Sequence, residues 1–179
     1  MTSDQSLYGQ SLYDVAADEG ITGELLEELA GVKAVFSENP DYIRLLSEPS
    51  IPKKERLELV DKAFSGEIHP YLLNFLKILL ENGLLRSFSS CVSVFRSNYN
   101  RDNGIAEANV TSAVELSAEE KTELLNKLEA LSGKKVLLKN VVDSSVLGGI
   151  RVELDGRLYD GTVSGRLADI RKKISQVVV

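Results

Sequence analysis

The sequence predicts a mainly α-helical protein, in which an N-terminal six-helix bundle is followed by a small α+β domain. Through the first two-thirds of the 179 residues, apolar side chains recur every three or four positions, which is the period of an amphipathic helix. After Gly104 the period changes to two, as in strands with one buried face. We therefore expect a helical domain over residues 1–104 and an α+β domain over residues 105–179.

The first helix is expected near residues 5–18, and it ends at Gly20. Four residues form its apolar face: Tyr8, Leu12, Val15 and Ala16. Thr22 is expected to cap the second helix, because a threonine side chain can accept a hydrogen bond from a free backbone N–H. Four more helices follow: a short one around Tyr42, one from Pro52 to Gly66, one from His69-Pro70 to Gly83, and one ending at Asn103-Gly104. The helix that begins at His69-Pro70 is apolar nearly all the way round, so we expect it to be central.

The α+β domain begins with a strand at 106–114, where apolar and polar residues alternate. Ser117 and Glu120 have the spacing of a capping box, and the helix that they open ends at Gly133. Further strands are expected at 135–142, 147–154 and 157–160, with Asp155-Gly156 as a tight turn between the last two. A final helix is expected, and its apolar face comprises Val163, Leu167, Ile170, Ile174 and Val177.

Composition excludes several classes of protein. The chain is 43% hydrophobic and carries a net charge of −6, which argues against disorder and against general nucleic-acid binding. It has one cysteine and no apolar run of 18 residues, so neither a disulfide framework nor a membrane span is expected. The charge is uneven: residues 1–48 hold ten acids against two bases, whereas residues 157–179 hold five bases against two acids. Different partners at the two ends would explain this, and so would two solvated helix faces.

No catalytic constellation is recognisable. One histidine and one cysteine cannot form a common zinc site. His69 is interpreted as a loop or cap residue, and Cys91 as a small core residue. The Gly148-Gly149 pair leads into a strand rather than a helix, so we interpret it as a bulge or a close backbone approach and not as a phosphate loop. We expect no cofactor, no metal and no enzymatic activity.

Several motifs resemble one protein family. The segment Tyr8-Gly9-Gln10-Ser11-Leu12-Tyr13-Asp14-Val15-Ala16 resembles the opening helix of the delta subunit of bacterial F-type ATP synthase. Asn74 to Gly83 resembles that family's central helix and its ending, although Leu84 replaces the usual arginine. The stretches from Val110 to Ser117, Val142 to Gly149 and Asp160 to Leu167 follow the family order, with Ser164 in place of another arginine.

This resemblance, which extends to the mitochondrial subunit that confers oligomycin sensitivity, implies a structural role. It implies a non-catalytic stator subunit that links the catalytic head to the peripheral stalk and so couples proton-driven rotation to ATP synthesis. The helical domain would bind the N-terminal helix of an alpha subunit, and the α+β domain the C-terminal end of the b subunit. The protein would lie at the cytoplasmic face of the bacterial membrane, without a span of its own.

The resemblance also implies partner-binding residues between the first and fifth helices: Tyr8 and Ser11 on one, Asn74 and Ile78 on the other. From the residues alone, a core position is favoured for Tyr8 and Ile78. The bases Arg166, Arg171, Lys172 and Lys173 are candidates for contact with the stalk. The alternatives are an adaptor domain of another complex, an enzyme whose site forms between domains, and a nucleic-acid-binding module using the basic C-terminal helix.

Overall fold

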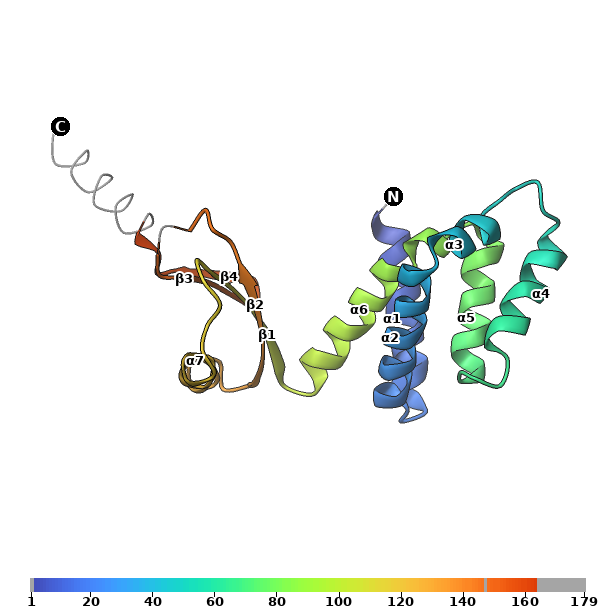
Figure 1. The fold of residues 1–179 in the computed structure, drawn as a ribbon. Coiled ribbons are helices and arrows are strands. Elements are labelled where there is room, and N and C mark those ends of the chain that lie inside the picture. The colour runs from blue at the N-terminus through green and yellow to red at the C-terminus, as the bar shows by residue number, and fades with distance from the viewer. Residues whose placement is uncertain (1, 147, 164–179) are drawn as a thin grey trace, which may run out of the picture. The chain divides into compact units, whose positions relative to one another are not determined.

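The computed structural model describes residues 2–146 and 148–163, with side chains from Ser6 onward. The chain forms two compact units, one running to Tyr99 and the other beginning at Asn100. Within the described residues, seven α-helices and a four-stranded sheet confirm the predicted mainly α fold with a small α+β part (Figure 1). The two units meet near the end of α6 (Phe88–Asp102). There Asn100 is buried and donates a 2.7 Å hydrogen bond to Glu107, which lies in β1 (Ile105–Ser112).

The helical unit has one continuous apolar core. Besides α6, its elements are α1 (Thr2–Asp18), α2 (Thr22–Glu38), α3 (Pro40–Leu46), α4 (Lys53–Phe64), α5 (Pro70–Glu81) and the 3-10 helix η1 (Leu85–Ser87). As predicted, α5 is central, since it contacts α1, α2, α4 and η1. It is not buried all round, however, because Tyr71, Asn74 and Ile78 lie exposed on one side of it.

The junction between α1 and α2 differs from the prediction. Thr22 is the first residue of α2 and not its cap; Ile21 holds the cap position and no side chain caps the helix. The turn explains this. Gly20 adopts a φ of +72°, and the N–H of Ile21 donates to the carbonyl of Ala16 at 2.9 Å, which closes the end of α1. Because one residue both closes α1 and opens α2, no position remains for a polar cap.

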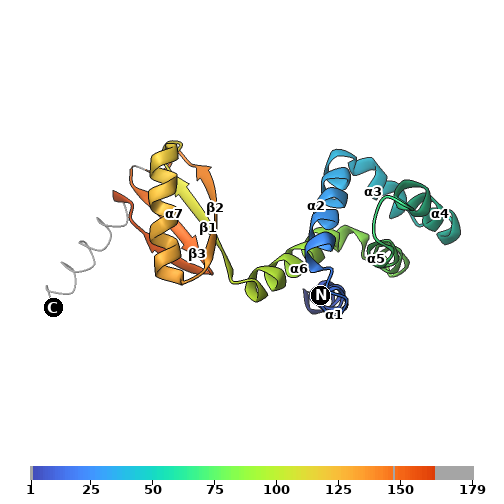
Figure 2. The ribbon, with the colours of Figure 1, turned by 90° about the horizontal axis from the view of Figure 1, so that it is seen from below.

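The second unit is a sheet with a helix on one face (Figure 2). Its elements besides β1 are α7 (Ala118–Ser132), β2 (Lys135–Val142), β3 (Ile150–Leu154) and β4 (Arg157–Asp160). The strand order is β2-β1-β3-β4, with β1 parallel to β2 and antiparallel to β3. The helix α7 supplies the crossover that a parallel pair requires. Its Leu128 packs on the buried face of the sheet, against side chains such as Val110 and Val152.

Local signals in this unit match the prediction closely. Ser117 and Glu120 form both bonds of a capping box, and Gly133 ends α7 at a φ of +67°. Asp155 and Gly156 both have positive φ, 48° and 76°, as a tight primed turn requires. The predicted strand at 147–154 is shorter and begins at Ile150. Of the predicted final helix only Val163 is described; Leu167, Ile170, Ile174 and Val177 lie outside the described residues.

Candidate partner-binding surface

Close packing against α6 fixes the position of α1. A Cβ atom on Gly9 would lie 2.7 Å from the carbonyl oxygen of Cys91, so only glycine permits this approach. Beside it, Asn98 donates a 2.7 Å hydrogen bond to the side chain of Gln10. The Tyr13 ring meets Phe95 edge-on with centroids 5.2 Å apart. These contacts all lie on the side of α1 that faces α6. The other side of α1 is not covered by α6 and lies beside α5.

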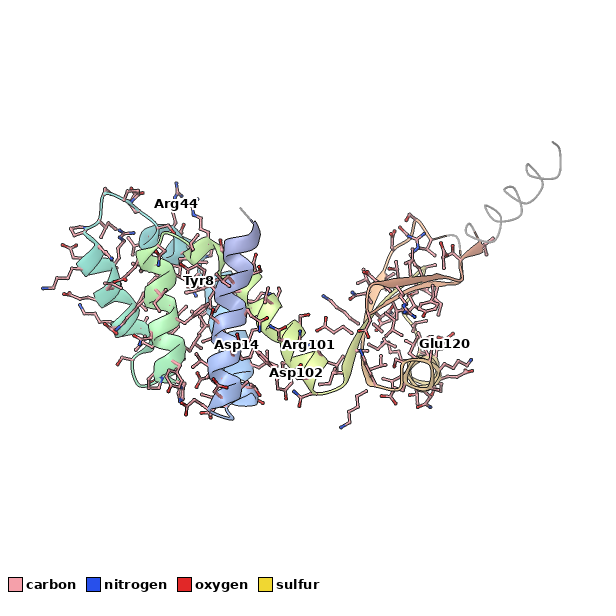
Figure 3. All side chains as sticks on the ribbon, turned by 180° about the vertical axis from the view of Figure 1, so that it is seen from behind. Tyr8, Asp14, Arg44, Arg101, Asp102 and Glu120 are labelled. Carbon is pink, nitrogen blue, oxygen red and sulfur yellow. The ribbon has the colours of Figure 1, made fainter. Side chains whose placement is uncertain are left out.

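That opposite side of α1 carries a partly apolar stripe. Tyr8 is half-buried and packs against the core, Ser11 is exposed, and Val15 is 42% exposed. Their spacing of three and four residues places them on one helix face. Figure 3 shows Tyr8 extending from α1 on the side where α5 lies.

A matching stripe runs along α5. Tyr71 and Ile78 are 38% and 44% exposed, and Asn74 between them is exposed. These residues are also three and four positions apart, so they share one face. Exposed apolar side chains that share one face are a feature of many protein interaction sites.

The two stripes belong to helices that contact each other. The Tyr71 hydroxyl donates a 3.2 Å hydrogen bond to Glu19, directly after α1. This bond to the Glu19 carboxylate, together with its negative charge, raises the pKa of Tyr71. The end of α1 thus lies beside the start of α5, so the helices run antiparallel. We name Tyr8, Ser11, Val15, Tyr71, Asn74 and Ile78 the α1–α5 surface.

The structure places all four predicted site residues on these two helices, and their role in binding stays a prediction. Of the four residues predicted to share the apolar face of the first helix, Leu12 and Ala16 are buried and Tyr8 is half-buried, whereas Val15 lies exposed at the edge of that face, where the α1–α5 surface begins. Val15 and Tyr71 were missed as members of the surface. The sequence signal was available, because Val15 lies seven residues after Tyr8 and Tyr71 seven before Ile78.

The two residues with the most reactive side chains have structural positions. His69 accepts a 3.2 Å hydrogen bond from the N–H of Tyr71 and caps α5, as predicted. Cys91 is buried, as predicted, and burial raises the pKa of its thiol. Among the described residues, no three His, Cys, Asp or Glu side chains form a group that could hold a metal ion. No helix in this part of the chain is long and apolar enough to cross a membrane.

The close backbone approach predicted at Gly148-Gly149 is confirmed. A Cβ atom on Gly149 would lie 2.4 Å from the carbonyl oxygen of Gly161. The predicted stalk contacts Arg166, Arg171, Lys172 and Lys173 lie outside the described residues.

A helical unit with an exposed apolar surface, followed by a small α+β unit, has the features of a protein-binding subunit. A sequence model of the ATP synthase delta (OSCP) subunit family matches residues 5–174. The chain is 35% identical to ATP synthase subunit delta of Lactobacillus gasseri over 170 residues, covering 94% of this chain and 93% of that one. It is 32% identical to the subunit delta of Halalkalibacterium halodurans, covering 93% and 92%.

A chain in the cryo-EM structure of the Toxoplasma gondii mitochondrial ATP synthase hexamer has a similar fold. Its TM-score is 0.76 at 18% identity, and the match covers 98% of this chain and 97% of that one. The chain therefore belongs to the ATP synthase delta (OSCP) subunit family. The predicted role as a stator subunit of an F-type ATP synthase is thereby confirmed.

Proposed function

We propose that this chain is a non-catalytic link between the catalytic head and the peripheral stalk, and that the α1–α5 surface binds the N-terminal helix of an alpha subunit. The helical unit, as a six-helix bundle, would hold the head, and the α+β unit would hold the C-terminal end of the b subunit. The protein would then lie at the cytoplasmic face of the bacterial membrane.

The observation that carries this proposal is the pairing of two apolar stripes on contacting antiparallel helices. An amphipathic guest helix binds such a surface through side chains three and four residues apart. Ser11 is small, which allows the guest backbone to approach closely, and Asn74 offers both a donor and an acceptor. Tyr8, Val15 and Ile78 supply apolar area.

The free energy available from the α1–α5 surface alone indicates why two attachment sites are needed. Burying a fully exposed Val, Ile or Tyr-sized side chain contributes about 1.5–3 kcal/mol. The apolar members of the α1–α5 surface are already half covered, so together they contribute roughly 3–6 kcal/mol. Nanomolar binding requires about 12 kcal/mol, so guest side chains and polar contacts must supply the remainder. A second site on the stalk raises the effective concentration of the first.

Calorimetric titration of the full chain with a peptide of the alpha subunit's N-terminal helix tests the binding surface. Ser11→Asp places a carboxylate where the guest must lie, and we expect the Kd to rise at least about thirtyfold because that charge would be desolvated. Ala17→Asp is the matched control, since it adds the same charge at an exposed position of α1 outside the stripe. An unchanged Kd for Ser11→Asp, or equal losses for both variants, would contradict the proposal.

The stalk contact is tested separately. Replacing Arg166, Arg171, Lys172 and Lys173 by glutamine should reduce capture of the b subunit's C-terminal segment and reduce the salt dependence of that capture. Binding of the alpha peptide should not change. Undiminished capture with the same salt dependence would reject a role for these four bases.

The non-catalytic part of the proposal rests on the positions of His69 and Cys91. The histidine nitrogen is occupied as a helix cap, and the thiol is buried with a raised pKa. Neither environment activates a nucleophile or a general base. Nucleotide hydrolysis by the purified chain alone would contradict this conclusion.

A further inference from the structure

The helical unit contains a cavity of about 630 Å³ that shares no residue with the α1–α5 surface. It is lined by α2, α3, η1 and the start of α6. Phe36 and Phe88 form its floor; both are buried, and their rings meet edge-on with centroids 5.2 Å apart. Phe36 also packs against Phe64 and Tyr42, so the floor is part of the core and is preformed.

The rim of this cavity is positively charged. Lys33 comes from α2, Arg44 from α3 and Arg86 from η1. Figure 3 shows Arg44 at the α3 edge of the helical unit. One carboxylate, Asp41, also lines the cavity. In a chain with a net charge of −6, three cations around one cavity are a local reversal of sign.

These three cations have no carboxylate partner within the described part of the chain. The ion pairs of the helical unit engage other bases, Lys53 with Glu81 and Lys77 with Asp61. Like charges around one cavity repel each other, so an anionic ligand would be attracted electrostatically. The aromatic floor adds a preference for an apolar group.

We propose that this cavity binds an acidic peptide segment, with one apolar side chain on the aromatic floor and flanking carboxylates on Lys33, Arg44 and Arg86. The cations stand on three separate elements, so they suit carboxylates distributed along a chain better than one compact anion. The volume falls within the range of ligand-sized sites. This site lies on different elements from the α1–α5 surface and would take a second partner, so it goes beyond the function proposed above.

The test uses the full chain and a fluorescein-labelled peptide with a central Leu-Phe pair flanked on each side by two glutamates, followed by fluorescence anisotropy at low salt. The triple variant Lys33→Gln, Arg44→Gln and Arg86→Gln should weaken binding about tenfold, the effect of three partly exposed ion pairs. The matched control is Lys54→Gln, Lys62→Gln and Arg96→Gln, which removes the same charge at exposed positions away from the cavity. It should change the Kd less than about twofold, since screening attenuates distant charges.

Two further probes separate the alternatives. A peptide with glutamines in place of glutamates, and one with serines in place of Leu-Phe, should each bind at least about tenfold more weakly. Equal losses in both triple variants would overturn the proposal in favour of nonspecific charge attraction. Complete displacement by millimolar inorganic phosphate would overturn it in favour of a simple anion site. If the triple variant loses its helical circular dichroism, the charge reversal Arg44→Glu alone carries the test, with Arg96→Glu as its control and an expected effect of about fivefold.

Discussion

The two units are held together in different ways. The core of the helical unit contains twenty buried residues, including all five phenylalanines of the chain. The described core of the α+β unit contains seven, of which two are alanine and none is aromatic. Side-chain packing therefore dominates in the first unit, whereas the second depends more on strand pairing around β1, which has a partner on both edges. A stator subunit built this way has one unit that depends on side-chain packing and one that depends on its sheet.

The sharpest test of this difference removes one large side chain from each core. Phe95 is fully buried, and Phe95→Ala should cost about 3–5 kcal/mol in the free energy of unfolding. Val110 is equally buried but smaller, so Val110→Ala should cost about 2 kcal/mol. Urea titrations followed by amide NMR signals from each unit would measure both. If each substitution shifts the midpoints of both units equally, the units unfold together and the comparison fails.

A second test uses two glycines of the helical unit. A Cβ atom at Gly9 would press against the backbone of Cys91, so Gly9→Ala should destabilise the unit by about 1–3 kcal/mol. Gly31, in α2, is exposed with nothing within 4 Å, so Gly31→Ala should stabilise it by about 0.5–1 kcal/mol. Thermal unfolding followed by circular dichroism would show whether each substitution lowers or raises the stability of the protein. A stabilising Gly9→Ala would mean that α1 can move away from α6.

Sequence reasoning succeeded where a few neighbouring residues determine the structure. The Ser117–Glu120 box and the Asp155-Gly156 turn depend on side chains and φ values within four positions. It failed at Thr22, because whether that residue is the N-cap or the first residue of α2 depends on how tightly the turn at Gly20 closes the preceding helix. Periodicity grouped Val15 with the apolar face of the first helix but did not show that it is exposed, because periodicity does not fix where the edge of the buried face lies.

Two features that distant segments assemble, the sheet topology and the cavity near Arg44, were not predicted. The parallel pairing of β1 with β2 joins residues about thirty positions apart, and the antiparallel pairing of β1 with β3 joins residues still further apart. The cavity near Arg44 combines side chains from α2, α3 and η1, which have no shared pattern in the sequence. The four proposed partner-binding residues came from a family resemblance, because composition and spacing do not distinguish an interface tyrosine from a core one.

The smallest expected effect is the pH dependence of stability, which differs between the two units: acid should destabilise one and alkali the other. Hydrogen bonds from Thr162 lower the pKa of Asp160, and hydrogen bonds from Ser145 lower that of Asp143, both in the α+β unit. A carboxyl whose folded pKa is depressed stabilises the fold above its unfolded value of 3.8, and this contribution disappears as the pH falls through the folded value. Acid should therefore destabilise the α+β unit.

In the helical unit, burial raises the pKa of Tyr42, whose hydroxyl donates a 3.0 Å hydrogen bond to the carbonyl of Leu59. That contribution is present below the unfolded value of 10.0 and disappears as the pH rises through the folded value. Thermal unfolding followed by NMR signals from each unit, at about pH 3, 7 and 10.5, would compare the pH dependence of stability in the two units. Asp160→Asn should reduce the acid sensitivity and Tyr42→Phe the alkaline one. Acid sensitivity confined to the helical unit would contradict the assignment.

The buried position of Cys91 has a practical consequence. It is the chain's sole thiol, 1% exposed and with a raised pKa, so thiol-directed reagents should react with it slowly in the folded protein. A cysteine introduced at an exposed serine would then be the one site open to a fluorophore, a spin label or a crosslinker. Contacts of this subunit inside an assembled rotary motor can thus be mapped one position at a time, without first removing a native residue.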